Sequence, residues 1–313
     1  MPTTGVPRWC PGNDLTVARA IDRQVAEIID IHSAAGRRFE AGGVRSFARE
    51  QRPPGGEGPL VVLIHGVPTS SFLYRKVLPV LADQGLHGLA LDFPGLGLAD
   101  RPSDFDYTWS GLARWLGQAL DAMEIERCHL VVHDIGGPIA CEWAVRNPER
   151  VVSLTALNTL LDPATFRRPW MMAPFAVRGV GELWLRGPRG LTAALFRRTG
   201  IAKPSKVTTA ELYAYHALLR RGDDGRAFLR IMRGFELTEQ KRRLLWDGLA
   251  GRTYPARIVW GEHDPVLGIE QLRIAQKVLR VDEPVLLPGK HFLQEDHPEA
   301  VGQAIADVVS PLG

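Results

Sequence analysis

An aspartate that stands between an apolar run and a pair of glycines is the residue of this sequence best suited to covalent chemistry. The run His129–Val132 leads into Asp134, and Gly136 and Gly137 follow it. This order predicts a strand, a tight turn and a helix, which is the context of the nucleophile elbow usually written G-x-S-x-G. Here Asp134 takes the place of the serine, and the glycines supply the small residues that a strained turn requires.

A carboxylate at that position changes the reaction that the elbow can perform. Asp134 can displace a leaving group from a saturated carbon and form an alkyl–enzyme ester, which water must then hydrolyse. The water needs a general base, and the tetrahedral intermediate needs an oxyanion hole. The alternative is that Asp134 only caps the helix that follows, which is a common structural use of aspartate.

Two further polar residues follow predicted strand ends. Asp264 comes after the apolar run Arg257–Trp260, and His291 comes after Pro284–Leu287. The order nucleophile, acid, histidine is that of an α/β-hydrolase triad. Asp264 would hold the tautomer of His291, the general base, and stabilise its charged form. Taken singly, His291 could be an exposed loop residue and Asp264 a helix cap.

The oxyanion hole is expected to consist of two backbone N–H groups. One belongs to Ile135, directly after the nucleophile, and the other to Val67, in the loop that follows the apolar run Leu60–Ile64. Val67 is preferred over Pro68 because proline has no N–H. His65 is interpreted as a residue of this loop and not as a catalytic group.

The elements that would position these residues alternate between strands and helices, which predicts an α/β fold with a mostly parallel, doubly wound sheet. The predicted buried strands are Leu60–Ile64, Gly88–Leu91, His129–Val132, Val151–Leu157, Arg257–Trp260 and Pro284–Leu287. The predicted helices between and after them are Phe72–Gln84, Trp109–Met123, Pro138–Arg146, Ile269–Leu279 and Pro298–Val309. Phe39–Glu50 is expected to form a hairpin.

One long segment contains helical patterns but no clear strand. Because it interrupts the alternation, it is expected to form a cap over the carboxyl edge of the sheet, where ligands bind in such folds. A helix over Leu15–Ser33 is predicted before the first strand. The expected organisation is a helical extension at 1–36, a core at 37–160 and 253–313, and a cap at 161–252.

Composition argues for a folded chain without a nucleic-acid or membrane partner. Hydrophobic residues make up 45% of the sequence and the net charge is only +3. The pairs Arg197–Arg198 and Arg220–Arg221 are taken to be offset by nearby acids. Met1–Leu15 does not have the pattern of a secretory signal, and no apolar run is long enough to span a bilayer, so a cytoplasmic location is expected.

No cofactor is expected. The three cysteines have no disulfide or metal-site spacing. The motif Gly95-Leu-Gly97 lacks the third glycine of a dinucleotide fingerprint. The expected partners are therefore a small hydrophobic substrate and water.

With these residues assembled, the chain resembles the haloalkane dehalogenase and epoxide hydrolase branch of the α/β-hydrolase superfamily over most of residues 38–312. The motifs that carry the resemblance are His65-Gly-Val-Pro-Thr-Ser-Ser71, the loop Leu91–Pro102 and the run Lys290–Pro298. The resemblance implies an α/β-hydrolase fold with a helical cap. It also implies an acid late in the chain, at Asp264, with Asn158 after the sixth strand; some relatives instead place the acid after that strand, which would be Asp162.

The sequence departs from this family at the leaving group. Dehalogenases usually carry tryptophan directly after the nucleophile and often asparagine or glutamate in the oxyanion loop, where this chain has Ile135 and Val67, which have no side-chain donor. Trp184 lies near the position where one subclass places a cap tryptophan. The predicted substrate pocket is accordingly apolar, and its residues are Ile135, Trp170, Met171, Trp184 and Tyr215.

The epoxide hydrolase interpretation meets a similar difficulty. The two cap tyrosines that those enzymes use fall near Met171 and Met232, and Tyr213 and Tyr215 lie elsewhere in the cap. The sequence thus predicts a hydrolase that forms an ester on Asp134, with haloalkane hydrolysis as the leading function. Epoxide hydrolysis is the alternative, and a ligand-binding protein with this fold and little turnover is a third possibility.

Overall fold

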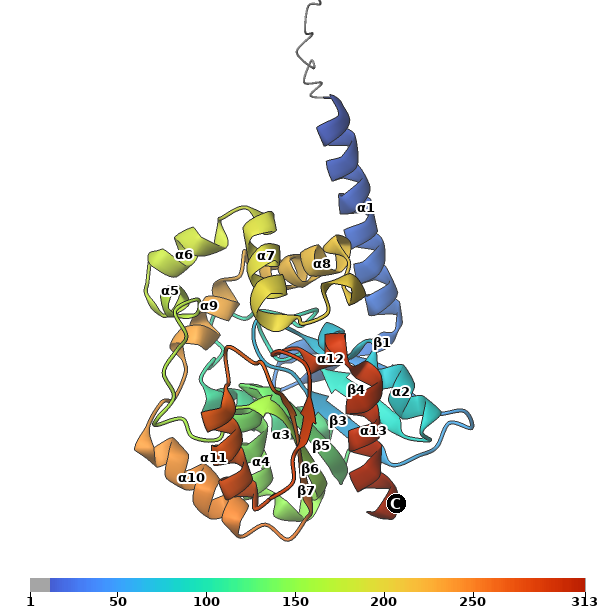
Figure 1. The fold of residues 1–313 in the computed structure, drawn as a ribbon, viewed down its shortest axis with the longest axis vertical. Helices are drawn as coiled ribbons and strands as arrows, with labels where there is room; N and C mark the ends of the chain where they lie inside the picture. The colour runs from blue at the N-terminus through green and yellow to red at the C-terminus, as the bar shows by residue number, and fades with distance from the viewer. Residues whose placement is uncertain (1–11, 313) are drawn as a thin grey trace, which may run out of the picture.

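An eight-stranded sheet forms the centre of the molecule (Figure 1). The computed structural model describes residues 12–312. The strands are β1 (Gly36–Ala41), β2 (Val44–Gln51), β3 (Leu60–Ile64), β4 (His87–Leu91), β5 (Cys128–Asp134), β6 (Val151–Thr159), β7 (Ala256–Gly261) and β8 (Val285–Leu287), in the spatial order β1-β2-β4-β3-β5-β6-β7-β8. β2 is antiparallel to both neighbours, whereas β3 to β8 are parallel. The predicted α/β fold with a mostly parallel sheet is confirmed.

The central strands are buried on both faces, as their continuous apolar runs indicate. In β3, Val61 and Leu63 join one hydrophobic cluster, and Val62 and Ile64 join the other. This alternation follows from the two-residue period of a strand, which directs successive side chains to opposite faces. The sheet therefore separates two cores, and each core is covered by its own layer of helices.

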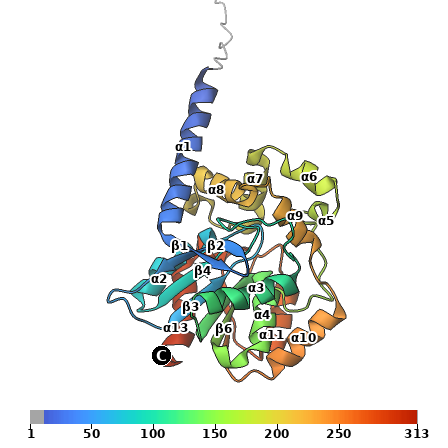
Figure 2. The ribbon, with the colours of Figure 1, turned by 180° about the vertical axis from the view of Figure 1, so that it is seen from behind.

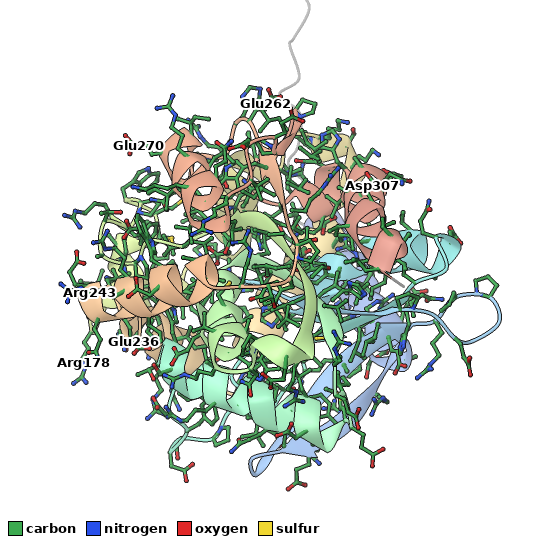
Figure 3. All side chains as sticks on the ribbon, turned by 90° about the horizontal axis from the view of Figure 1, so that it is seen from below. Arg178, Glu236, Arg243, Glu262, Glu270 and Asp307 are labelled. Atoms are coloured by element: carbon green, nitrogen blue, oxygen red, sulfur yellow. The ribbon has the colours of Figure 1, made fainter. Side chains whose placement is uncertain are left out.

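The two helix layers contain the helices that the sequence predicts, except that the predicted helix Phe72–Gln84 is divided into a 3₁₀ turn and the shorter α2. On one face, α2 (Val77–Asp83) packs against α13 (Pro298–Val309). The other face carries α3 (Trp109–Ala122), α4 (Gly136–Arg146), α10 (Glu239–Ala250) and α11 (Ile269–Leu279). The short α12 (Leu293–Asp296) precedes α13, and single 3₁₀ turns stand at Ser71–Tyr74, Pro148–Arg150, Pro204–Lys206 and Ser310–Leu312. Charged side chains such as Arg243, Glu270 and Asp307 point outward from these layers (Figure 3).

Five helices between β6 and α10 form the cap above the carboxyl ends of the parallel strands (Figure 1). They are α5 (Ala173–Ala176), α6 (Val180–Leu185), α7 (Arg189–Gly200), α8 (Thr209–Arg220) and α9 (Arg226–Arg233). The expected cap, 161–252, also includes α10, but α10 packs on α4 and α11 in the core layer. The buried ion pair between Lys241 of α10 and Glu142 of α4 holds it there, so the packed cap ends before α10.

The N-terminal helix α1 (Gly12–Ala34) lies alongside α8 of the cap (Figure 2). It contains the predicted helix Leu15–Ser33, whereas residues 1–11 of the expected extension lie outside the described part of the chain. Asp22 of α1 forms an ion pair with Arg189 of the cap. Near its end, His32 is buried and its Nδ1 lies 3.0 Å from Arg49 Nη1 of β2, so α1 contacts both cap and core. Within residues 12–312, no helix has the length and apolar character needed to cross a membrane.

Candidate active site

Asp134 occupies a sharp turn between β5 and α4. Its φ angle is +52°, a left-handed conformation that is strained for a residue other than glycine. The Thr159 hydroxyl donates to the Asp134 carbonyl oxygen at 2.6 Å, and a Cβ atom on Gly137 would come within 1.7 Å of Thr159 Oγ1. The turn therefore needs the small residue that the sequence motif supplies, and it places the aspartate at the carboxyl edge of the sheet.

The loop after β3 brings backbone donors to the Asp134 carboxylate. The Val67 N–H donates to Asp134 Oδ2 at 2.8 Å, and the Ile135 N–H also donates to this carboxylate. A Cβ atom on Gly66 would lie 2.3 Å from Asp134 Oδ2, so only glycine allows so close an approach. These are the two donors that the sequence predicts for an oxyanion hole.

His65 has a role in holding this loop. Its Nδ1 is 2.8 Å from the Gly66 carbonyl oxygen, and its Nε2 accepts from the Phe93 N–H at 3.2 Å. Because the Phe93 N–H is a donor, Nε2 must be the unprotonated nitrogen and the ring proton is on Nδ1. Both ring nitrogens therefore form hydrogen bonds. Burial lowers the pKa of His65, which agrees with this neutral form.

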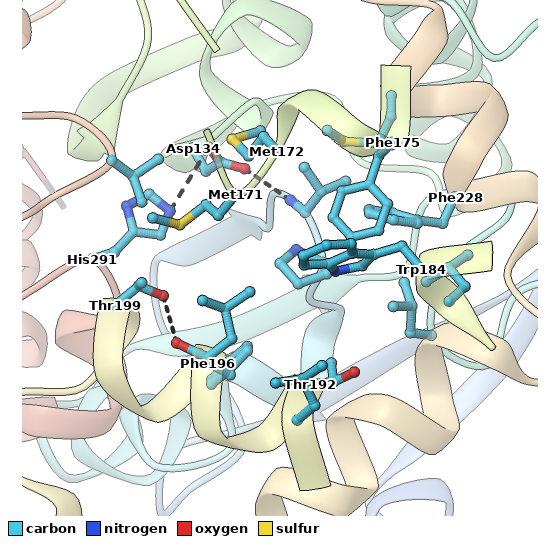
Figure 4. Close-up of a pocket in the computed structure, with 18 of the residues that line it drawn as sticks. Asp134, Met171, Met172, Phe175, Trp184, Thr192, Phe196, Thr199, Phe228 and His291 are labelled. Carbon is cyan, nitrogen blue, oxygen red and sulfur yellow. Dashed lines mark hydrogen bonds and ion pairs between the residues drawn. The ribbon is translucent and has the colours of Figure 1, made fainter. Parts of the chain in front are cut away.

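The three residues predicted as a triad meet at the edge of the sheet. His291 Nδ1 lies 2.8 Å from Asp264 Oδ2, and His291 Nε2 lies 3.8 Å from Asp134 Oδ1 (Figure 4). All three side chains are buried. The Nε2 atom of His133 is 2.9 Å from the carbonyl oxygen of His291, so the residue before the nucleophile helps to hold the backbone of the histidine.

The carboxylate of Asp264 is fixed by several donors. Its Oδ1 accepts from the N–H groups of Val266 and Leu267 at 2.7 and 3.1 Å. Its Oδ2 accepts from Asn158 Nδ2 at 2.6 Å, and Asn158 Oδ1 in turn accepts from the Gly261 N–H at 2.9 Å. The asparagine near the end of β6 therefore orients the acid that lies after β7.

Asp162, the alternative acid, makes a different contact. It is buried and accepts a hydrogen bond from the Thr165 N–H at 3.3 Å. The ion pairs of His291 within residues 12–312 are with Asp264 and Asp134. The geometry thus favours Asp264 over Asp162 as the partner of the histidine.

Opposing influences set the protonation of the nucleophile and the base. Burial raises the pKa of Asp134, although His291 and the N–H groups of Val67 and Ile135 act in the other direction. Burial alone would lower the pKa of His291, but the contacts with Asp264 and the charge of Asp134 outweigh it and raise that pKa. The charged form of His291 is therefore stabilised as long as Asp134 carries its negative charge.

A cavity of about 110 Å³ lies between this edge and the cap (Figure 4). Asp134 and His291 stand at its base, and most of the remaining wall is apolar, including Met171, Met172, Phe175, Phe228 and Met232. Within residues 12–312, no three His, Cys, Asp or Glu side chains are placed to hold a metal ion.

Side-chain donors are few in the cavity wall. Apart from His291, they belong to Trp184, Thr192 and Thr199. The Thr199 hydroxyl already donates to the Leu195 carbonyl oxygen at 2.8 Å. Trp184 and Thr192 are therefore the wall residues with a donor available for a leaving group.

The predicted substrate-binding residues divide into two groups. Met171 and Trp184 line the cavity, whereas Ile135, Trp170 and Tyr215 do not. Ile135 is 2% exposed and belongs to the buried hydrophobic core, and Trp170 is 70% exposed. Tyr215 stacks behind Phe196 and donates its hydroxyl to Glu295. The expectation that these three residues line the pocket is therefore corrected.

Other wall residues were not identified from the sequence. Phe196 and Phe292 stack with ring centroids 4.3 Å apart, and both line the cavity beside His291. The position of Phe292 next to His291 was the only signal available for either. Phe196, like Phe175 and Phe228, belongs to a cap helix whose inward face cannot be identified until the cap is placed over the sheet.

Comparison with known proteins agrees with this architecture. The family described as alpha/beta hydrolase fold matches residues 59–298, which is well over half of the chain. The chain belongs to the α/β-hydrolase fold family.

Two curated relatives and one solved structure place this hydrolase more closely. It is 30% identical over 270 residues to a haloalkane dehalogenase of Mesorhizobium japonicum, covering 80% of this chain and 84% of the relative. It is 28% identical over 277 residues to a haloalkane dehalogenase of Psychrobacter cryohalolentis, covering 81% and 85%. The structure of a haloalkane dehalogenase from Bradyrhizobium elkani, 24% identical, superposes with a TM-score of 0.75 over 88% of this chain and 98% of that chain. The enzyme is a haloalkane dehalogenase-like α/β hydrolase.

Proposed function

We propose that this hydrolase cleaves the carbon–halogen bond of small apolar haloalkanes through an ester on Asp134. The observation that carries the proposal is the division of labour between the two carboxylate oxygens. Asp134 Oδ2 accepts the Val67 N–H at 2.8 Å, whereas Oδ1 faces His291 Nε2 at 3.8 Å. One oxygen is thus held where an oxyanion would need donors, and the other is left to attack.

In the first step, Asp134 Oδ1 forms a bond to the halogen-bearing carbon. The carbon–halogen bond breaks as this bond forms, and the halide leaves with the electron pair of that bond. Since a carboxylate is already the reactive form of the nucleophile, no base takes part in this step. The product is an alkyl ester whose carbonyl oxygen is Oδ2.

Formation of the ester changes the electrostatics of the base. The negative charge of Asp134 is one of the influences that raise the pKa of His291, and esterification removes that charge. The pKa of His291 therefore falls, and the neutral imidazole becomes available at the moment when a base is required. Asp264 stays in place and holds Nδ1 as the donor.

In the second step, His291 Nε2 takes a proton from water while the water oxygen bonds to the carboxyl carbon of Asp134. Negative charge develops on Oδ2 between the Val67 and Ile135 N–H groups. Collapse of the intermediate breaks the bond to Oδ1, and the protonated His291 returns its proton to the departing alcohol. The alcohol leaves with Oδ1, and the water oxygen stays in the regenerated carboxylate, whose remaining proton passes to solvent.

The composition of the cavity wall favours a halide over an epoxide as the leaving group. Met171 and Met232 line the wall and have no donor, and no tyrosine is among the wall residues within 12–312. An epoxide oxygen, which needs a proton donor, has few partners here. A halide can accept from the Trp184 indole N–H, and large halides leave with weaker assistance.

The test is a single turnover of an alkyl bromide in water labelled with heavy oxygen. The proposal expects stoichiometric bromide release, heavy oxygen in the peptide that contains Asp134, and unlabelled alcohol. Asp134→Asn is the matched control and should release no bromide. Heavy oxygen that appears in the alcohol during the first turnover would exclude the ester intermediate on Asp134. Diol from an epoxide without bromide release would assign epoxide hydrolysis, and retention of unreacted ligand would assign a binding protein.

A further inference from the structure

Exposed apolar side chains are concentrated at one edge of the cap. Six of the ten large hydrophobic side chains that are exposed in the described chain lie between residues 170 and 191, with exposed fractions of 37% to 72%. They are Trp170, Val177, Val180, Leu183, Trp184 and Leu191. We call this stretch, from Trp170 through α5 and α6 to the first turn of α7, the cap edge. Exposed apolar groups gathered in this way mark a surface that contacts something other than water.

The cap edge contains Arg178, Arg186 and Arg189, of which Arg189 pairs with Asp22, and it lies within a longer basic segment of the sequence. Residues 163–206 contain nine Arg and Lys residues and a single acid, Glu182, which is already paired with Arg233. The net charge of this segment is therefore +8 while that of the whole chain is +3, so the rest of the chain is net negative. The exposed side chains of Arg178 and Arg186 form no ion pair with any residue of the described chain whose side chain is placed.

This distribution corrects an expectation drawn from the sequence. The pair Arg197–Arg198 was expected to be offset by nearby acids, but residues 183–210 contain no Asp or Glu. Near charge balance of the whole chain conceals the asymmetry, because the acids that produce it lie in other elements. The expectation that the protein does not bind a membrane surface was also based on the small net charge of the whole chain.

The cap edge is continuous with the active-site cavity. Trp184 and Leu191 are 37% and 58% exposed, and both also line the cavity above Asp134. α5 and α6 lie on the side of the cap away from α1 in both views (Figures 1 and 2). In Figure 4, Trp184 stands across the cavity from His291. The cavity therefore opens among the exposed apolar side chains of the cap edge.

We propose that the cap edge binds the surface of an anionic lipid bilayer and that apolar substrate enters the cavity from that surface. Arginine and lysine attract anionic headgroups, tryptophan favours the interface between headgroups and acyl chains, and exposed leucine and valine insert into the acyl boundary. The charge and the apolar groups are thus both accounted for by one occupant. The entry of substrate rests on the proposed function, whereas the binding of lipid does not.

The experiment measures binding of the full-length protein to vesicles by flotation. Vesicles of equimolar phosphatidylcholine and phosphatidylglycerol are compared with vesicles of phosphatidylcholine alone. The wild type should bind the anionic vesicles, and added salt should weaken the binding because it screens the headgroup charge. Leu183→Glu and Arg186→Glu should each reduce the partition coefficient by about fivefold or more, the size expected from the loss of one favourable side chain at a membrane surface.

Matched controls make the same chemical changes far from the cap edge. Ile269→Glu replaces a 59% exposed side chain on α11, and Arg243→Glu reverses an exposed charge on α10 (Figure 3). Both controls should bind vesicles like the wild type. Asp134→Asn should do so as well, because lipid binding needs no turnover, and this separates failure of the lipid proposal from failure of the proposed reaction.

Three results would overturn the proposal. The first is equal or absent binding to the two kinds of vesicle. The second is an equal loss of binding in Leu183→Glu and Ile269→Glu. The third is a protein that fails to bind anionic vesicles but self-associates in solution and becomes monomeric in Leu183→Glu. That result would assign the cap edge as an interface between copies of the chain.

Discussion

The two walls of the cavity are built on different principles. At the sheet edge, each functional group is held by hydrogen bonds: Val67 donates to Asp134, His291 to Asp264, and Asn158 to Asp264. The cap wall consists largely of methionine, phenylalanine and leucine side chains. These side chains define the shape of the cavity but offer few directional hydrogen bonds. The proposed chemistry, which depends on tenths of an ångström, is thus assigned to the sheet, and recognition of the proposed apolar substrate is assigned to the cap.

One buried cluster joins the two regions. Arg75, after β3, pairs with Glu211 of the cap helix α8 and with Glu295 of α12, and Tyr215 of α8 also donates to Glu295. Loss of Glu295 would leave the buried guanidinium of Arg75 with Glu211 as its remaining partner in the cluster, which is expected to be destabilising. The cap is thus anchored to the core through α8, whereas α5 and α6 lie on the side of the cap away from α1.

The largest effect should come from the base at the sheet edge. His291→Gln should leave the first step intact and stop the second, because attack by a carboxylate needs no base but hydrolysis of the ester does. Halide release from an alkyl bromide should stop after one equivalent per enzyme molecule. Mass spectrometry should then find the alkyl group on Asp134. Sustained multiple turnover in a folded His291→Gln variant would be incompatible with this mechanism.

Replacement of the acid should have the next largest effect. Asp264→Asn should slow ester hydrolysis by a factor on the order of 10⁴, in line with the loss of the acid in serine triads. Asp162→Asn is the matched control, since Asp162 is also buried but, within residues 12–312, bonds only to the Thr165 N–H. The hydrolysis rate is measured as alcohol formation after rapid mixing. An inactive Asp162→Asn beside an active Asp264→Asn would reverse the assignment.

The sheet edge could be predicted from the sequence because its residues are fixed by local motifs. Parallel strands end at a common edge, so Asp134, Asp264 and His291, each just after an apolar run, had to lie near one another. Asn158 carried a weaker signal: its bond to Asp264 joins residues from the ends of two neighbouring strands. The position of Asn158 was noted because of the resemblance to a family, and no pattern in its own segment of the sequence indicated its role.

The cap could not be predicted to the same depth. Its helices are short, and periodicity alone does not say which side of α5, α6 or α7 faces the cavity. Ile135 was expected in the pocket because of its position after the nucleophile. In the structure it is 2% exposed and packs among core residues. Its side chain is not part of the cavity wall, whereas that of Val67, on the facing loop, lines the cavity.

A donor added at Val67 should therefore raise the rate of halide departure. Its side chain lines the cavity next to Asp134, and its own N–H already contacts Oδ2. Val67→Asn would supply an amide donor, and a hydrogen bond to a charged group contributes about 1.5–3 kcal/mol, which corresponds to roughly tenfold to hundredfold in rate. Alkyl chlorides should benefit more than bromides, which the ratio of halide-release rates would reveal. Val67→Leu, which adds no donor, is the control, and an equal gain in both variants would reject a role for the donor.

The smallest predicted effect concerns the stability of the resting site. Burial raises the pKa of Asp134, so the unfolding free energy of the wild type falls as pH rises through the range above the ordinary pKa of aspartate. The raised pKa of His291 changes stability in the same direction with pH, because its stabilising contribution is full below the ordinary pKa of histidine and is lost as pH rises through the folded-state pKa. Above that point the carboxylate of Asp134 has lost its charged partner.

Asp134→Asn removes the charge, keeps an acceptor for the Val67 N–H, and suits a positive φ because asparagine tolerates that conformation. The variant should therefore melt higher than the wild type, by about 2–4 °C for each 1 kcal/mol gained, and by more in alkaline than in neutral buffer. Thermal unfolding of both proteins in the two buffers measures this, and a variant that melts lower in both would mean that the ionised Asp134 stabilises the fold.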